Sequence, residues 1–152
     1  DLSDAYEMIS SVADIINKKK EAEILVKKIK YQFSGIDAAK FKGKKVAYFI
    51  WYNPFMVAAS DTFINYLLEK LGMVNAFSFL SRYPEVNASQ IKGSAPELIF
   101  LSSEPFPFKE KHVEELLQIC PNAQIQLVDG EMFSWYGSRL LLAPAYFESM
   151  NI

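Results

Sequence analysis

The chain has 152 residues, of which 51% are hydrophobic, 14% aromatic and 22% charged, and its formal net charge at pH 7 is −2. This length suits one domain with its own hydrophobic core, and the near-neutral charge gives no reason to expect a nucleic acid or an anionic membrane surface as partner. The sequence has no run of about 18 or more apolar residues, which excludes a membrane-spanning helix, and its single cysteine, Cys120, excludes an internal disulfide.

Two helices are predicted at the start of the chain. Apolar residues at helical spacing predict the first over residues 2–17, with Ser3 or Asp4 as its N-cap. The residues expected on its inner face are Ala5, Ile9, Val12 and Ile16. The lysines at 18–20 indicate a break, and the second helix is expected over 22–33.

Short hydrophobic strands are predicted after these helices. They lie at residues 46–50, 73–77, 98–101 and 125–128. Helical patterns separate most of them, at 60–72 with Ser60 as the cap, at 89–93 and at 109–119, and a last helix is expected from Ser138. This alternation predicts the α/β class, as a three-layer αβα Rossmann-like lobe with a parallel four- to five-stranded sheet, preceded by a long connecting helix.

Each predicted strand leads into a loop that carries aromatic residues. In a parallel sheet the carboxyl ends of the strands lie on one edge, and ligands bind in the crevice outside them. A single Trp or Phe is more often part of the core, but Trp and Tyr beside Pro, Asn and Gly in loops suit a bulky, partly solvated ligand. The aromatic residues expected to bind it are Trp51, Tyr52, Tyr83, Phe106, Trp135 and Tyr136.

Two charged residues in the same loops are also candidates. Arg139 is expected in the first turn of the last helix, where a cation opposes the helix dipole at a cost of about 0.3–1 kcal/mol. It is therefore expected either to pair with Asp129 or Glu131, or to face an anionic group of the ligand. Glu104 follows the predicted strand 98–101, either as a stabiliser of a helix start or as a carboxylate in the crevice.

Catalytic and metal-binding motifs do not emerge from the sequence. The only histidine, His112, falls in the polar part of the predicted helix 109–119, so neither a His-based triad nor a His-bearing metal cluster is expected. Cys120 lies just before Pro121 at the end of this helix, as an inert structural thiol. No glycine-rich phosphate loop follows any predicted strand. We expect no catalytic residue and no metal held by protein side chains.

Five segments in chain order carry a family resemblance: YFIWYNP at 48–54, DTFIN at 61–65, RYP at 82–84, PELIFLSSEP at 96–105, and residues 128–139. Together they resemble the helical-backbone, class III periplasmic substrate-binding proteins of ABC importers, the group with vitamin B12- and ferric-siderophore-binding members. This resemblance implies two α/β lobes joined by a long rigid helix, with the ligand between them. It assigns residues 1–34 to the connecting helix and a following helix, and 35–152 to the C-terminal lobe, with the N-terminal lobe absent from this chain.

The resemblance also implies a function. It makes the chain the solute-binding component of an ABC importer, located in the periplasm or attached as a lipoprotein to the outer face of the membrane, with the importer's membrane subunits as partners. The implied ligand is a bulky metal chelate, namely a corrinoid, a ferric siderophore or haem, held in an aromatic-lined cleft between lobes. No intrinsic cofactor is implied, because the chelate already satisfies its metal.

Two positions compare directly with the B12-binding member of that family. Tyr83 matches an aromatic residue that touches the corrin there. Ser89 stands where that member has a glutamate that docks the lobe onto the transporter, so the resemblance does not supply this docking contact here.

Two other functions stay open at this point. One is a small α/β enzyme that uses Glu104, Asp129 or Glu131 as acid or base in the same crevice; the other is a corrinoid- or haem-sensing interaction domain. A carboxylate with a raised pKa in a closed pocket would favour the enzyme, whereas an open, aromatic-lined surface would argue against it.

Overall fold

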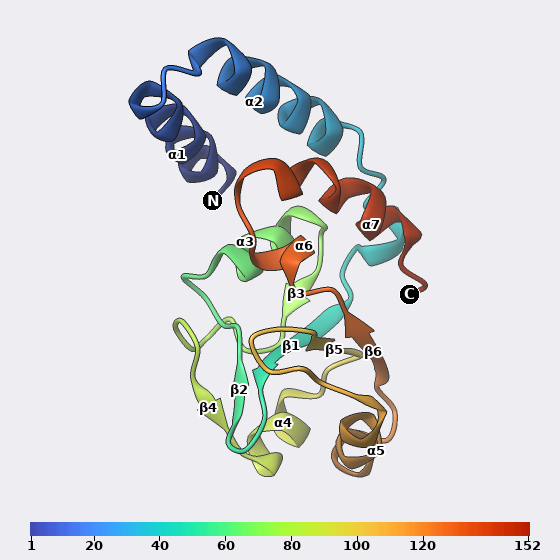
Figure 1. The fold of residues 1–152 in the computed structure, drawn as a ribbon. Helices are drawn as coiled ribbons and strands as arrows, with labels where there is room; N and C mark the ends of the chain where they lie inside the picture. Colours follow the sequence, from blue (N-terminus) through green and yellow to red (C-terminus); the bar gives the residue numbers. More distant parts are fainter.

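The computed structural model describes residues 1–152 as one mixed sheet covered by helices on both faces (Figure 1). The helices are α1 (Leu2–Ile15), α2 (Lys19–Ser34), α3 (Phe63–Lys70), α4 (Ala88–Ser94), α5 (Glu110–Ile119), α6 (Glu131–Ser134) and α7 (Ala143–Ser149), with short 3-10 helices η1 (Ala39–Phe41) and η2 (Gly137–Leu141). The strands are β1 (Lys45–Trp51), β2 (Phe55–Val57), β3 (Val74–Asn75), β4 (Glu85–Val86), β5 (Leu98–Ser102) and β6 (Gln124–Val128).

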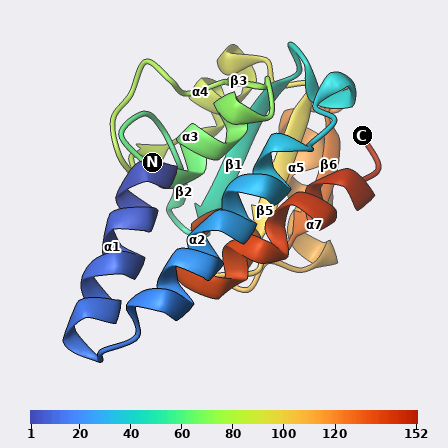
Figure 2. The ribbon, with the colours of Figure 1, turned by 90° about the horizontal axis from the view of Figure 1, so that it is seen from above.

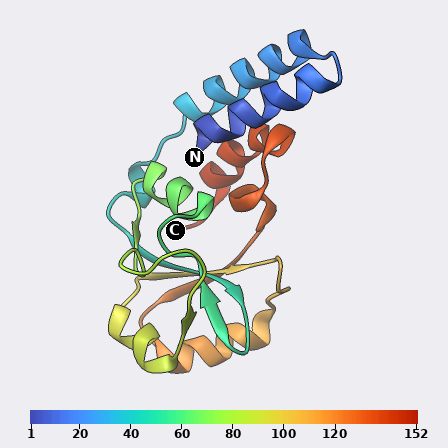
Figure 3. The ribbon, with the colours of Figure 1, turned by 90° about the vertical axis from the view of Figure 1, so that its left-hand side faces the viewer.

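The layers follow the predicted αβα arrangement. Helices α3, α6 and α7 cover one face of the sheet, and α4 and α5 cover the other (Figure 3). Successive residues of the central strands point to opposite faces, so Tyr48 and Phe100 enter the core under α6 and α7, while Phe49 and Ile99 enter the core over α4 and α5. Both cores are continuous and apolar, which confirms the three-layer α/β class.

Helices α1 and α2 form an antiparallel pair that lies on the layer of η2 and α7 (Figure 2). The predicted cap of the first helix is wrong: the side chain of Asp1 accepts the backbone N–H groups of Ser3 and Asp4. The inner face is also shifted. Its buried residues are Leu2, Ala5, Ile9 and Ala13, whereas Val12 and Ile16 are exposed. Small alanines on this face allow the close approach of α2, and this turns Val12 outward.

The sheet has the strand order β4-β2-β1-β5-β6, with β3 paired to the first residues of β1. Strands β3, β1, β5 and β6 are parallel, as predicted. Strands β2 and β4 are antiparallel additions that the sequence pattern did not indicate. They arise because the chain reverses directly after Trp51, where Asn53 adopts a left-handed backbone with φ of 57°, a conformation that Asn tolerates well.

Two helices also begin at other residues than predicted. Thr62, not Ser60, caps α3, since its Oγ1 accepts the N–H of Asn65 at 3.0 Å. Ser60 instead pairs with Ser81 of a neighbouring loop. The predicted last helix is divided into η2 and α7, and Pro144 lies in the first turn of α7, where its missing N–H costs no helical hydrogen bond.

Candidate ligand-binding site

The carboxyl ends of β1, β5 and β6 lie side by side on one edge of the sheet, as predicted. Strand pairing places Phe49 beside Leu101 and Ser102 beside Val128, so the loops that follow these strands start next to one another. Two of them, residues 103–109 and 129–139, carry most of the predicted site residues.

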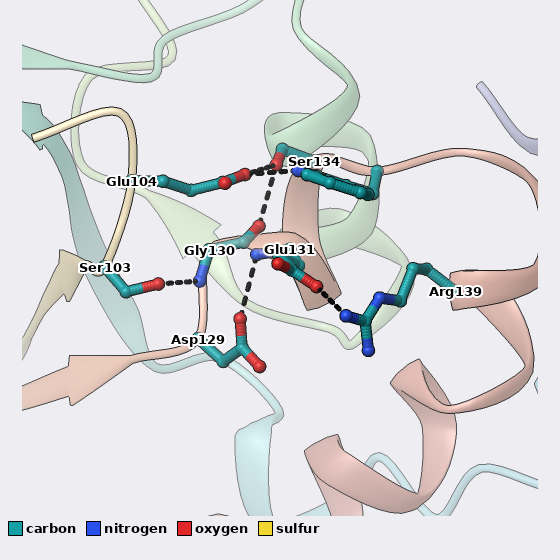
Figure 4. A network of polar contacts seen from close by, with 8 residues as sticks. Ser103, Glu104, Asp129, Gly130, Glu131, Ser134 and Arg139 are labelled. Atoms are coloured by element: carbon teal, nitrogen blue, oxygen red, sulfur yellow. Dashed lines mark hydrogen bonds and ion pairs between the residues drawn. The ribbon is translucent and has the colours of Figure 1, made fainter.

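These two loops are joined by backbone and hydroxyl contacts (Figure 4). The Oγ of Ser103 accepts the N–H of Gly130 at 2.9 Å, and the N–H of Ser103 donates to the carbonyl of Val128 at 2.9 Å. A Cβ at position 130 would lie 2.6 Å from Cγ of Glu104, so only glycine fits this close approach. A glycine shortly after the end of β6 indicates a close approach of another part of the chain, but the sequence does not predict that this part is the loop 103–109.

The carboxylate of Glu104 holds the side chains of the second loop. Its Oε1 accepts hydrogen bonds from the indole Nε1 of Trp135 at 2.6 Å and from Oγ of Ser134 at 2.9 Å (Figure 4). Trp135 therefore has one edge fixed while much of its ring stays exposed. The hydrogen-bond partners of Glu104 are the side chains of Ser134 in α6 and of Trp135, the residue that follows it. A role of Glu104 as a carboxylate of the crevice stays a prediction.

Arg139 forms an ion pair with Glu131, one of the two carboxylates that the sequence analysis named as its partner. Its Nη2 lies 2.5 Å from Oε2 of Glu131 (Figure 4), and its guanidinium lies 5.9 Å from the centre of the Trp135 ring. Asp129 is not the partner, since its Oδ1 accepts the N–H of Glu131 at 3.0 Å in a turn. The pairing prediction with Glu131 is confirmed, and a contact of Arg139 with ligand stays a prediction.

Trp51, Tyr52 and Phe106 form a first aromatic cluster at the β1–β2 turn. The ring of Phe106 lies 5.7 Å from that of Trp51 and 5.6 Å from that of Tyr52. The hydroxyl of Tyr52 donates to Oε2 of Glu115 at 2.9 Å, and this bond raises the pKa of Tyr52. Phe106 thus lies between the rings of Tyr52 and Trp51, and Trp51 is the most open of the three.

His112 is buried instead of lying in the polar part of its helix, and it has a packing role there. The ring is buried, with Tyr52 at 4.7 Å and Phe106 at 5.2 Å, because the loop before α5 folds over the first helical turn. Its Nδ1 accepts the N–H of Lys109 at 2.9 Å. His112 is therefore a helix cap and a packing residue, and no serine or carboxylate lies in hydrogen-bond contact with it.

Tyr136 packs on Phe63 of α3, with ring centres 4.7 Å apart and a T-shaped arrangement. Burial raises the pKa of Tyr136, and the negative charge of Asp4 raises it further. Tyr83 lies in the loop before β4, where the carbonyls of Arg82 and Pro84 accept the N–H groups of Ala59 and Val57. The supporting role of Phe63 was not recognised from sequence, because its position in the α3 stripe predicts a core residue.

The edge is an open surface. A hollow of about 800 Å³ lies away from it, lined by α2 residues such as Tyr31 together with Leu141 and Leu142. No group of three or more His, Cys, Asp or Glu side chains could hold a metal ion. None of the helices has both the length and the apolar character needed to cross a membrane.

The sequence model of the periplasmic binding protein family matches residues 2–119. The chain belongs to this family. Its members are binding proteins, so the enzymatic alternative based on Glu104, Asp129 or Glu131 is not supported. The resemblance recognised in the sequence is thereby confirmed.

Solved structures of periplasmic proteins share the fold of this family member. A possible iron-binding, periplasmic solute-binding protein of Staphylococcus epidermidis has a TM-score of 0.80 and 20% identity, over 99% of this chain and 63% of its own. A haem-binding protein of Roseiflexus sp. RS-1 has a TM-score of 0.75 and 15% identity, over 91% and 58%. The vitamin B12-binding protein of Vibrio cholerae has a TM-score of 0.66 and 18% identity, over 95% and 58%.

The chain thus spans less than two thirds of the length of each of these three structures. No curated protein matches the sequence.

Proposed function

We propose that this periplasmic binding protein binds a bulky metal chelate, namely a corrinoid, a ferric siderophore or haem, as the solute-binding component of an ABC importer. One observation carries the proposal. Three large rings in the segments that follow β1 and β6 stay 40% to 47% exposed, namely Trp51, Tyr136 and Trp135, and Tyr83 in the loop before β4 is 39% exposed. Large rings gathered on an open surface are typical of a ligand or interaction site.

The kind of ligand is inferred from the chemistry of this edge. Its side chains offer flat apolar faces with polar rims and no cluster of metal ligands, which suits a ligand that already satisfies its own metal. Structures with the same fold include proteins described as haem-binding and vitamin B12-binding, and one described as an Fe3+-hydroxamate transport system. Trp51, Tyr52, Tyr83, Glu104, Phe106, Trp135, Tyr136 and Arg139 are the residues assigned to the site.

The domain organisation is part of the proposal. Residues 1–34 are the connecting helix between two lobes and the helix that follows it, 35–152 are the C-terminal lobe, and a second lobe supplies the opposite wall of the cleft. The open shape of the edge supports this division, as does the greater length of the structural relatives. The protein is placed in the periplasm or on the outer face of the membrane, where it meets the importer's membrane subunits. Ser89 is exposed on α4 but uncharged, so docking uses another side chain.

The experiment is a titration of tryptophan fluorescence, corrected for ligand absorbance, with cyanocobalamin, haemin and ferrichrome. We expect quenching by at least one of them, and binding at least about tenfold weaker in Trp135→Ala, equivalent to ~1.4 kcal/mol. Tyr31→Ala is the matched control, since Tyr31 is a highly exposed ring on α2, away from the edge. Absence of binding by all three chelates, or equal binding by Trp135→Ala, contradicts the proposal.

A further inference from the structure

Glu104 makes its contacts to Trp135 and Ser134 through a single oxygen. Oε1 accepts both the indole N–H and the Ser134 hydroxyl. Hydrogen bonds to a charged acceptor are shorter and stronger than those between neutral groups, and the indole N–H distance of 2.6 Å agrees with this. Because the indole has only this one donor, the bond fixes how the ring is turned about its side-chain axes.

The backbone that carries this carboxylate is anchored in the core. The buried hydroxyl of Tyr48 donates to Oγ of Ser102 at 3.2 Å, and Oγ of Ser102 donates to the carbonyl of Glu104 at 2.6 Å. Tyr48 and Ser102 are 0% and 1% exposed. Gly130 closes the other side, since no side chain fits between it and Glu104. The position of the carboxylate is thus determined by the core beneath the loop.

The charges around the Trp135 ring do not cancel. Arg139 lies over the ring, but its guanidinium is paired with Glu131. The ion pairs of the chain include none to Glu104. The ring is therefore bordered by one neutralised cation and one carboxylate whose negative charge has no basic partner.

The geometry points to Glu104 as a positioning residue that also sets the charge preference of the site. It holds Trp135 as a fixed surface for stacking, and its charge favours chelates that are neutral or cationic, such as ferric hydroxamates, over strongly anionic ones, such as ferric tricatecholates. This inference rests on the proposed function for its ligand, whereas the positioning of the ring is a property of the protein alone.

Positioning is tested without ligand, in a Trp51→Phe background that leaves Trp135 as the only tryptophan. We expect the Trp135 indole N–H to show slow hydrogen exchange by NMR and a distinct near-UV circular dichroism band. Glu104→Ala removes both signals, while Glu104→Gln retains them because its amide oxygen can accept the same bond. Glu114→Gln, an exposed carboxylate of α5, leaves them unchanged. Equal spectra for Glu104→Ala and its parent overturn the positioning role.

If Glu104→Ala fails to fold, the positioning role is tested by indole hydrogen exchange in the Trp51→Phe protein and in its Glu104→Gln variant. Rapid exchange in the folded Trp51→Phe protein would also overturn the positioning role.

The charge preference is tested with ferrioxamine B, a cationic ferric trihydroxamate, against ferric enterobactin, a strongly anionic tricatecholate. The protein with both tryptophans in place should prefer the cation, and Glu104→Gln should reduce that preference about tenfold, or ~1.4 kcal/mol, while Glu114→Gln does not.

A preference of the unsubstituted protein for the tricatecholate, or an unchanged ratio in Glu104→Gln, overturns the charge inference. If neither siderophore binds, the charge preference fails, whereas the chelate-binding function is decided separately by the titrations with cyanocobalamin, haemin and ferrichrome. The ligand-free spectra decide whether Glu104 positions Trp135.

Discussion

The guanidinium of Arg139 is paired with the carboxylate of Glu131 at 2.5 Å, so the one cation beside Trp135 is already neutralised in the protein without ligand. Both side chains are partly exposed, and ion pairs of this kind contribute only about 0.2–1 kcal/mol to stability. Breaking the pair therefore changes the charge beside Trp135 while it changes the free energy of unfolding only slightly.

Glu131→Gln is expected to free Arg139 for an anionic group of a ligand. Affinity for haemin, which carries carboxylates, should rise several-fold, while the free energy of unfolding changes by less than about 1 kcal/mol. Equilibrium titration with haemin and urea denaturation measure the two quantities. Glu114→Gln serves as the control, and a lower haemin affinity in Glu131→Gln would refute this role of the pair.

Gly130→Ala should disrupt the packing between the loops 103–109 and 129–139. The new Cβ would lie 2.6 Å from Cγ of Glu104, and overpacking of this kind costs about 1–3 kcal/mol. Gly93→Ala is the matched control, since no atom lies within 4 Å of its Cβ and alanine favours the helix α4. Chemical denaturation should show a loss for the first variant and none for the second; equal stabilities would contradict the packing seen at Gly130.

Tyr48→Phe removes one hydroxyl from the buried chain beneath Glu104. Ser102 can still donate to the Glu104 carbonyl, so the expected loss is that of one hydrogen bond, about 1 kcal/mol of unfolding free energy. Tyr31→Phe, at a highly exposed ring, should have no effect. A neutral or stabilising Tyr48→Phe in urea denaturation would show that this bond does not support the loop.

Stability should decline in alkaline solution. Burial raises the pKa of Tyr48 and of Tyr146 above the ordinary value of about 10. The unfolded chain then loses these protons at lower pH than the folded one, so the stabilisation is complete below about pH 10 and is lost as pH rises toward the folded-state pKa values. Denaturation midpoints measured against pH should fall above pH ~10, and less steeply in Tyr48→Phe. An identical slope in the variant would contradict the assignment.

The sequence predicted the parts of the fold that depend on local periodicity. Strands β1, β5 and β6 are recognisable because each is a short apolar run bounded by turn residues, and their carboxyl ends meet as the parallel arrangement requires. Strands β2 and β4 have only three and two residues, too few for a period to be visible. Their position depends on the reversal at Asn53, which is a tertiary feature.

The site was predictable as a set of rings but not as a set of contacts. Trp51 and Trp135 could be recognised by residue type and by their place after strands. The hydrogen bond between Glu104 and Trp135 could not be predicted, because the two residues come together only through the pairing of β5 with β6. The burial of His112 could not be predicted either, since the loop that covers it carries no periodic signal.

The central claim is that the exposed rings at the carboxyl ends of β1, β5 and β6 bind the chelate. The most direct measurement is NMR of the two indole N–H groups, Trp51 and Trp135, during titration with diamagnetic probes, cyanocobalamin and gallium-loaded ferrichrome. Both indole resonances should shift with a bound probe, while the amides of Tyr31 and Leu142, in the hollow on α2, stay in place. Shifts confined to that hollow, with both indoles unmoved, would contradict the claim.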